Sequence, residues 1–158
     1  MDPDQKRKSL RNLSYGVYVL TVKSADDYAG ATVTWVSQAS LNPPQIMIGL
    51  RRGSKTTALV KKVGEFALNI IGEGQKGIAS AFLKHAAIDG KKINGYEFKT
   101  EHTKAPILKD VPSYLECRVD KYYEGSDHDL VIAEVINAGV QTDHLPLDLR
   151  STGWSYGG

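Results

Sequence analysis

The sequence predicts a mainly β domain, a closed antiparallel barrel with helical insertions. Many short stretches are rich in β-branched and aromatic residues, whereas only two or three short segments have a helical period. No repeat, low-complexity linker or composition shift divides the 158 residues. We therefore expect a single domain over residues 1–158, large enough to bury a real core.

A helix and a hairpin are predicted first. Residues 4–13 favour a short helix with Pro3 near its start, and Leu10 and Leu13 share one face of it. Residues 17–24 predict a strand. The pair Asp26-Asp27 then favours a turn, and residues 28–34 return as the second arm of the hairpin.

The middle of the chain alternates strands and helices. Pro43-Pro44 excludes both a helix and a central strand at that point. Residues 45–50 predict a short apolar strand. After Gly53 the apolar period becomes helical and ends at Gly64. Residues 66–71 predict another buried strand, and residues 75–83 carry one apolar helical stripe.

The last third ends in two long strands. Residues 84–104 are predicted to be irregular, with turns at Asp89-Gly90 and Asn94-Gly95. Strands are predicted at residues 113–123 and 129–138. Residues 124–128 join them.

Charge and hydropathy exclude several classes of function. Twenty basic and eighteen acidic residues leave a net charge of +2, which is too little to indicate nucleic-acid binding. The basic run Lys6-Arg7-Lys8 is interpreted as the solvated face of a helix rather than a nucleic-acid patch, because no basic stripe continues it. We expect no signal peptide, because the first ten residues are polar and charged, and no apolar run approaches the ~20 residues that span a bilayer. We expect a soluble, cytoplasmic protein.

Cys117 is the only cysteine, so no intrachain disulfide can form. This composition fits a reducing cytoplasm. Its segment alternates like a strand, and no base is placed to activate it. A buried structural thiol is therefore predicted in preference to a nucleophile.

Residues 32–40 are a candidate surface for a flat polar ring. Small hydroxyl and amide side chains leave room for a ring and offer hydrogen bonds to its edge; they are Thr32, Thr34, Ser37, Gln38 and Ser40. The alternative is a hydroxyl-rich strand that faces solvent. Trp35 suits stacking near the ligand, burial against a partner subunit, or a plain core role.

Residues 51–57 are a candidate phosphate site. Gly53 lets the backbone approach closely, and Ser54 can cap the following helix, whose first amides carry partial positive charge. Arg51, Arg52 and Lys55 would add charge to this cradle. The spacing is not that of a P-loop. The alternative is an ordinary capped helix with flanking charges.

His128 is the histidine that we single out, because it lies at the mouth of the last hairpin. A side chain there can reach a ligand, although a hydrogen bond to Asp127 is the simpler interpretation. His85, His102 and His144 lie in polar loops without spaced carboxylate or cysteine partners, so no metal site is predicted. No arrangement of residues indicates a catalytic triad.

At these residues the chain resembles the flavin reductase-like family with an FMN-binding split barrel. The match is carried by residues 13–21, 32–44, 66–70 and 114–128, so it spans nearly the whole chain. Trp35-Val36-Ser37-Gln38-Ala39 and Phe82-Leu83-Lys84 are most similar to the flavin reductase module of cyanobacterial diflavin flavoproteins and to flavoredoxin-like proteins.

The resemblance implies a six-stranded antiparallel Greek-key barrel, a homodimer, and FMN bound near the interface. Residues 32–37 would line the isoalloxazine, residues 54–56 would take the phosphate, and His128 would lie beside the ring near the nicotinamide. The family has Gly-Asp-His at this turn, whereas here Ser126 precedes Asp127-His128. The full candidate cofactor-binding set is Thr32, Val33, Thr34, Trp35, Ser37, Gln38, Ser40, Arg51, Ser54, Lys55 and Thr56, with His128 as the candidate catalytic residue.

Three hypotheses about function follow. The first is an NAD(P)H:flavin oxidoreductase, in which reduced nicotinamide stacks on bound FMN and passes a hydride to it. The second is an electron-transfer flavoprotein that a redox protein partner reduces. The third is a non-catalytic module that binds another planar or nucleic-acid ligand.

Overall fold

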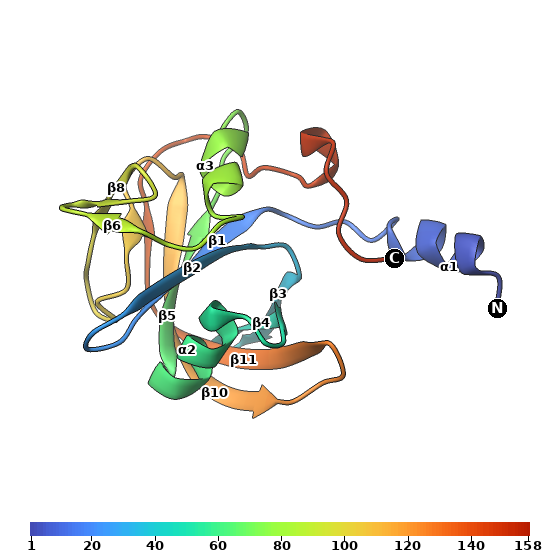
Figure 1. The fold of residues 1–158 in the computed structure, drawn as a ribbon, viewed down its shortest axis with the longest axis horizontal. Helices are drawn as coiled ribbons and strands as arrows, with labels where there is room; N and C mark the ends of the chain where they lie inside the picture. Colours follow the sequence, from blue (N-terminus) through green and yellow to red (C-terminus); the bar gives the residue numbers. More distant parts are fainter.

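The computed structural model describes residues 1–158 and confirms a mainly β fold with short helices (Figure 1). The helices are α1 (Pro3–Leu10), α2 (Lys55–Val63) and α3 (Lys76–Ala81), with a 3₁₀ turn at Arg150–Thr152. The strands are β1 (Tyr18–Lys23), β2 (Tyr28–Val33), β3 (Val36–Leu41), β4 (Pro44–Arg51), β5 (Glu65–Ile70), β6 (Ile88–Asp89), β7 (Lys92–Ile93), β8 (Tyr96–Lys99), β9 (Ile107–Leu108), β10 (Ser113–Tyr123) and β11 (His128–Val140).

The main sheet is antiparallel and has seven strands in the order β2-β1-β5-β10-β11-β4-β3. In a flat sheet, six gaps of about 4.8 Å would put β2 about 29 Å from β3. Yet only Thr34 and Trp35 join these two edge strands, and such a link spans about 11 Å at most. The sheet must therefore curl until its edges meet. That closure places residues 32–35 at the seam of the barrel.

The seventh strand is a departure from the predicted six. Residues 36–41 lie between two predicted strands and mostly within the candidate ring-binding surface, but they form β3 and pair with β4. Pro44 opens β4, at the end of a tight connection where no ladder hydrogen bond is lost. Hydroxyl and amide side chains suit this strand because its outer positions, Ser37 and Gln38, are exposed.

Two large apolar clusters and one small cluster fill the fold. One lies inside the barrel, where Leu20, Ile48 and Phe66 are fully buried beneath α2. The other large cluster lies between β1, α3 and residues 147–149 and includes Val19, Phe82 and Ile93. Cys117 belongs to the first cluster, and burial raises the pKa of its thiol to about 12. The prediction of a buried, unreactive thiol is confirmed.

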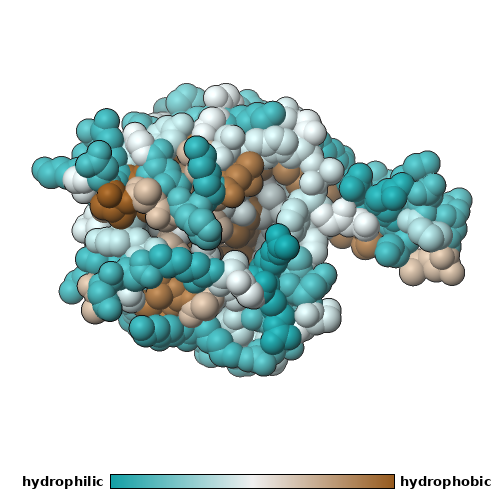
Figure 2. Space-filling model, in the orientation of Figure 1, coloured by the Kyte–Doolittle hydropathy of each residue, from teal (hydrophilic) through white to brown (hydrophobic).

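Two local predictions need correction. Helix α1 ends at Leu10 rather than Leu13 and buries none of its residues, because it projects away from the barrel (Figure 1 and Figure 2). Residues 84–104 are not irregular throughout, since β6, β7 and β8 form a small sheet there. The predicted turns make that sheet possible: Gly90, Asn94 and Gly95 all have positive φ angles.

Candidate functional site

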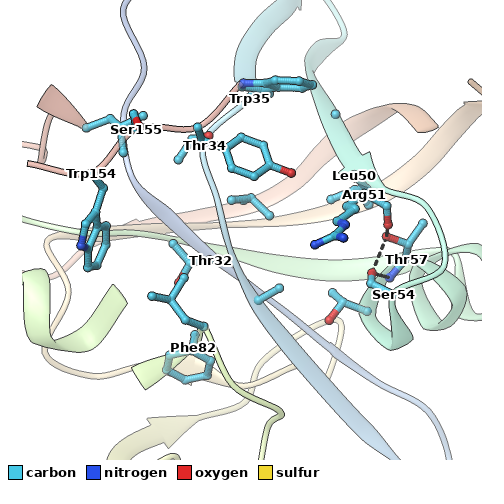
Figure 3. A pocket seen from close by; sticks show the side chains of 17 residues that line it. Thr32, Thr34, Trp35, Leu50, Arg51, Ser54, Thr57, Phe82, Trp154 and Ser155 are labelled. Carbon is cyan, nitrogen blue, oxygen red and sulfur yellow. Dashed lines mark hydrogen bonds between the residues drawn. The ribbon is translucent and has the colours of Figure 1, made fainter. Parts of the chain in front are cut away.

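A cavity of about 490 Å³ opens beside the seam of the barrel. The seam residues Thr32, Val33, Thr34 and Trp35 form one wall, and the loop and first turn of α2 form another. Its lining residues are Ala31, Thr32, Val33, Thr34, Trp35, Gly49, Leu50, Arg51, Ser54, Thr56, Thr57, Phe82, Leu83, Leu149, Trp154, Ser155 and Tyr156. In Figure 3, Arg51, Ser54 and Thr57 lie at one end, whereas Thr34, Ser155 and Trp154 lie toward the other.

The N-terminus of α2 forms the polar end of this cavity. Ser54 is the N-cap, and its Oγ accepts a hydrogen bond of 3.1 Å from the amide of Thr57. The Thr57 hydroxyl donates to the carbonyl of Arg51 at 2.8 Å, which fixes the loop against the helix. The amides of Lys55 and Thr56, in the first turn, have no intrahelical acceptor. They are available to an anion together with the helix dipole.

The three basic residues of this loop have different roles. Arg51 lines the cavity and has no carboxylate within ion-pair distance. Arg52 faces the last hairpin, where it donates to the carbonyl of Gly125 at 2.6 Å and pairs with Asp129 at 3.4 Å. Lys55 pairs with Asp27 at 2.7 Å and lines a neighbouring cavity of about 340 Å³.

The seam residues differ in their free hydrogen-bonding capacity. The Thr32 hydroxyl already donates to the carbonyl of Ala79 at 2.6 Å. The Thr34 hydroxyl and the indole N–H of Trp35 are buried without any hydrogen-bond partner. Unpaired buried polar atoms are rare in folded proteins and call for an explanation. Both residues line the cavity, although these two atoms themselves have almost no exposed surface.

Several predicted site residues do not line the cavity. Ser37, Gln38 and Ser40 lie on β3, where Ser37 and Gln38 are exposed and bond only to neighbouring backbone carbonyls. Strand β3 is an edge strand of the sheet, and none of its residues lines the cavity. Their contact with the ligand stays a prediction.

His128 contacts Trp35 but does not line the cavity. Its ring centroid is 4.3 Å from that of Trp35, and its Nε2 is 2.7 Å from the hydroxyl of Tyr156. Its Nδ1 is 3.0 Å from the carboxylate of Asp127, so the hydrogen bond considered for this turn is present and lowers the pKa of Asp127. The catalytic role of His128 stays a prediction.

Sequence reasoning missed most of the apolar wall. Phe82 and Leu83 follow α3, and Trp154 and Tyr156 come from the last six residues of the chain. Phe82 and Leu83 were assigned to a helical stripe and contributed to the family resemblance, but they were not predicted to line the site. Two large aromatic residues in an otherwise small and polar C-terminal tail were a signal that could have been noticed.

The structure also corrects one argument about histidine. Glu101, His102 and Glu116 lie within 4.8 Å of one another, although His102 has no carboxylate partner at metal-ligand spacing in the sequence. The buried Glu116 carboxylate already accepts hydrogen bonds from Thr103 (2.7 and 2.8 Å), Asn137 (2.7 Å) and the amide of His102 (3.2 Å). This cluster therefore fastens the loop before β9 to the sheet.

The structure thus combines a curled antiparallel barrel with a capped helix N-terminus that lines a cavity at the barrel seam. Residues 10–151 match the flavin reductase like domain. The chain belongs to this family, and the split-barrel fold is that of its relatives.

Individual relatives agree with this assignment. The NADPH-flavin oxidoreductase of Streptomyces viridifaciens is 36% identical over 141 residues, which cover 85% of this chain and 73% of that protein. Diflavin flavoprotein A 1 of Synechocystis is 33% identical over 134 residues, which are 84% of this chain but only 23% of the relative. The chain thus spans about a quarter of the diflavin flavoproteins that it matches.

Solved structures show the same architecture. The NADH:FAD oxidoreductase of Streptomyces globisporus, in complex with NAD and FAD fragments, superposes with a TM-score of 0.80 at 25% identity over 92% of this chain and 86% of that one. The styrene monooxygenase flavin reductase of Pseudomonas putida superposes with a TM-score of 0.71 at 28% identity, over 84% of each chain. None of the helices of the present chain has the length and apolar character needed to cross a membrane.

Proposed function

We propose that the chain is an NAD(P)H:flavin oxidoreductase that binds FMN in the cavity at the barrel seam. The observation that carries the proposal is the continuity of this cavity from the seam to the N-terminus of α2. A flavin mononucleotide has a planar polar ring at one end and a phosphate at the other. The two walls offer hydrogen-bonding groups for the first and an anion site for the second.

The residues present suit that ligand. The unpartnered Thr34 hydroxyl would bond to the polar edge of the ring. The phosphate would accept hydrogen bonds from the amides of Lys55 and Thr56 and from the guanidinium of Arg51. Phe82 and Leu83 would contact the ring on its apolar side.

When bound, the flavin supplies the ring that accepts a hydride. The protein's contribution is to bind the ring in one orientation and to exclude water from its apolar side. A strong general acid is not required, which agrees with the lack of a catalytic triad. His128 is our candidate for a residue on the nicotinamide side of the site. Because it contacts Trp35 and Tyr156 and does not line the cavity itself, it would act by positioning those two rings.

The test uses the purified protein with added FMN. We expect absorption bands of bound flavin and oxidation of NADH or NADPH that depends on the flavin. Protein that takes up FMN but oxidises neither nucleotide would refute the nicotinamide step. Protein that takes up no flavin would refute the whole proposal.

The match to diflavin flavoproteins favours a second candidate function. Because the chain covers only 23% of such a relative, an equivalent module works there beside other domains. An electron-transfer flavoprotein reduced by a redox protein partner is consistent with this. Rapid reduction of bound FMN by a small iron–sulfur donor, together with inertness to both nucleotides, would select it over the first.

We also propose that the protein is a cytoplasmic homodimer. Met47, Leu130 and Ile132 share the outer face of β4 and β11, and Met47 and Leu130 are 37% and 39% exposed. An apolar sheet face suits contact with a second copy of the chain. The single, unpaired Cys117 is compatible with a reducing compartment.

A further inference from the structure

The C-terminal segment, residues 153–158, lies outside the part of the chain that matches the family. The match ends at residue 151, yet Trp154, Ser155 and Tyr156 line the same cavity as the seam and α2. In Figure 3, Trp154 and Ser155 lie on the side of the cavity opposite Arg51 and Ser54. The segment therefore adds a wall that the family-matched residues do not supply.

Contacts with Lys76 and Thr152 hold Trp154 in place. The carbonyl of Thr152 accepts a hydrogen bond of 2.5 Å from Lys76 Nζ, and the same ammonium lies 4.9 Å from the centre of the Trp154 ring. The amide of Trp154 donates to the Thr152 hydroxyl at 2.9 Å. A cation over an indole face and two backbone anchors fix the ring at the cavity wall.

Contacts with Trp35 and His128 hold Tyr156 in place. Its ring packs edge-on against Trp35, with centroids 5.3 Å apart and an interplanar angle of 63°. Its hydroxyl meets Nε2 of His128 at 2.7 Å. The next residue, Gly157, accepts a hydrogen bond of 3.1 Å from Arg11, which ties the tail to the segment after α1.

Gly157 also explains how the tail can pass so close to the site. A Cβ added there would lie 2.8 Å from a ring carbon of Trp35, and the residue has a φ of +80°. Only glycine tolerates both the contact and the backbone conformation without strain. The tail is thus a docked part of the fold. Tyr156 is 41% exposed, and its ring contacts Trp35 and His128.

We propose that the C-terminal segment completes the ligand site, and that Trp154 and Tyr156 bind the planar ring of the flavin. This inference rests on the proposed function. Two aromatic rings anchored to different parts of the barrel form a rigid apolar wall, and planar rings prefer such partners in stacked or edge-on contact. Closing the wall over the ring would also slow the release of the bound flavin.

The experiment compares full-length protein with Trp154→Ala, Tyr156→Ala and a chain that ends at Thr152. FMN is titrated into each, and its fluorescence, dissociation constant and release rate are measured. Aromatic side chains in contact with a flavin quench its fluorescence. Leu145→Ala is the matched control, because this side chain lies in the preceding segment, is 66% exposed and does not line the cavity.

We expect the wild type and the Leu145→Ala control to bind FMN with strong quenching. Each aromatic variant should bind about tenfold more weakly, release the flavin faster and leave it brighter. Tyr156→Phe should keep the quenching, because the ring remains. Unfolding curves show which variants are folded, and the two point variants test the proposal if the truncated chain is not.

Two other outcomes overturn the inference in distinguishable ways. If the wild type binds FMN and both folded point variants match it in affinity and fluorescence, the tail is not part of the site and the proposed function stands. If the wild type binds no flavin, the proposed function fails and the inference fails with it.

Discussion

Arg51, the last residue of β4, and Arg52, which follows it, have different neighbours. Arg51 lines the cavity and is unpaired, whereas Arg52 is engaged by Gly125 and Asp129 of the last hairpin. Successive side chains of an extended segment point to opposite sides, so neighbours in the sequence need not share a function. This makes the pair a matched test of the phosphate site.

We predict that Arg51→Gln weakens FMN binding about tenfold, because it removes one hydrogen bond from a charged donor, worth roughly 1.5–3 kcal/mol. Binding of riboflavin, which has no phosphate, should not change. Arg52→Gln is the control and should leave both affinities intact while lowering stability. Equal losses for FMN and riboflavin in Arg51→Gln would place the phosphate elsewhere.

Glu116 is a buried carboxylate whose role is structural. Burial raises its pKa, but the hydrogen bonds from Asn137, Thr103 and His102 outweigh burial and hold the pKa below its ordinary value of 4.5. The folded state therefore binds this proton less readily than the unfolded state. The stability that the ionised group contributes is complete above about pH 4.5 and is lost as the pH falls through the lower, folded-state pKa.

We predict that Glu116→Gln lowers the free energy of unfolding by about 3 kcal/mol at pH 7, since an amide NH₂ replaces one of the two acceptor oxygens that the buried donors use. The difference from wild type should shrink as the pH is lowered below 4.5. Urea unfolding at several pH values measures it. A difference that stays constant with pH would show that the ionised form contributes nothing.

At the scale of elements, α2 connects the core to the site. Its buried side contacts the barrel through Leu59 and Val60, and its N-terminus points its free amides at the cavity. Ser54 caps that end, and Gly64 ends the helix in the left-handed conformation with a φ of +76°. A capping residue therefore stabilises each end of the helix, but only the N-terminal end faces the cavity.

We predict that Ser54→Ala and Gly64→Ala each lower stability by about 1 kcal/mol, the first by loss of a cap and the second by backbone strain. Only Ser54→Ala should also weaken FMN binding. Denaturant unfolding and FMN titration of both variants check this. A loss of FMN affinity in Gly64→Ala would mean that general destabilisation, rather than the local geometry, controls binding.

For the whole molecule, the seam of the barrel couples ligand binding to folding. Residues 32–35 close the sheet and line the cavity, so a bound flavin contacts residues that are brought together only in the folded state. We predict that FMN at a hundred times its dissociation constant raises the free energy of unfolding by about 2.7 kcal/mol. Unfolding curves with FMN and with riboflavin measure the effect. No change in the midpoint with saturating FMN would contradict binding at the seam.

The proposed homodimer can also be tested on the whole molecule. The chain has a mass of 17.3 kDa, and light scattering should give twice that value. Leu130→Lys should shift the protein towards the monomer, because it places a charge in the apolar face of β11. Leu145→Lys, at an exposed position away from that face, should not. A wild-type monomer would refute the dimer.

Much of the architecture could be predicted from local patterns. The hairpin of β1 and β2, the capped helix α2 and the long strands β10 and β11 follow from β-branched content, helical period and turn residues. The phosphate end of the site was also predictable, because Ser54 and the free amides of α2 are neighbours in the sequence. Strand β3 was not, since its polar residues lack the usual strand signal and pair only because β4 lies beside them.

The sequence by itself determined the fold class, the resemblance to flavin reductases and the polar half of the site. Only the tertiary structure decided which side chains meet. It separated Arg51 from Arg52, placed His128 behind Trp35, and brought Trp154 and Tyr156 to the cavity from the far end of the chain. The physical reason is that local periods specify elements, whereas closure of the sheet and docking of the tail depend on contacts between distant residues.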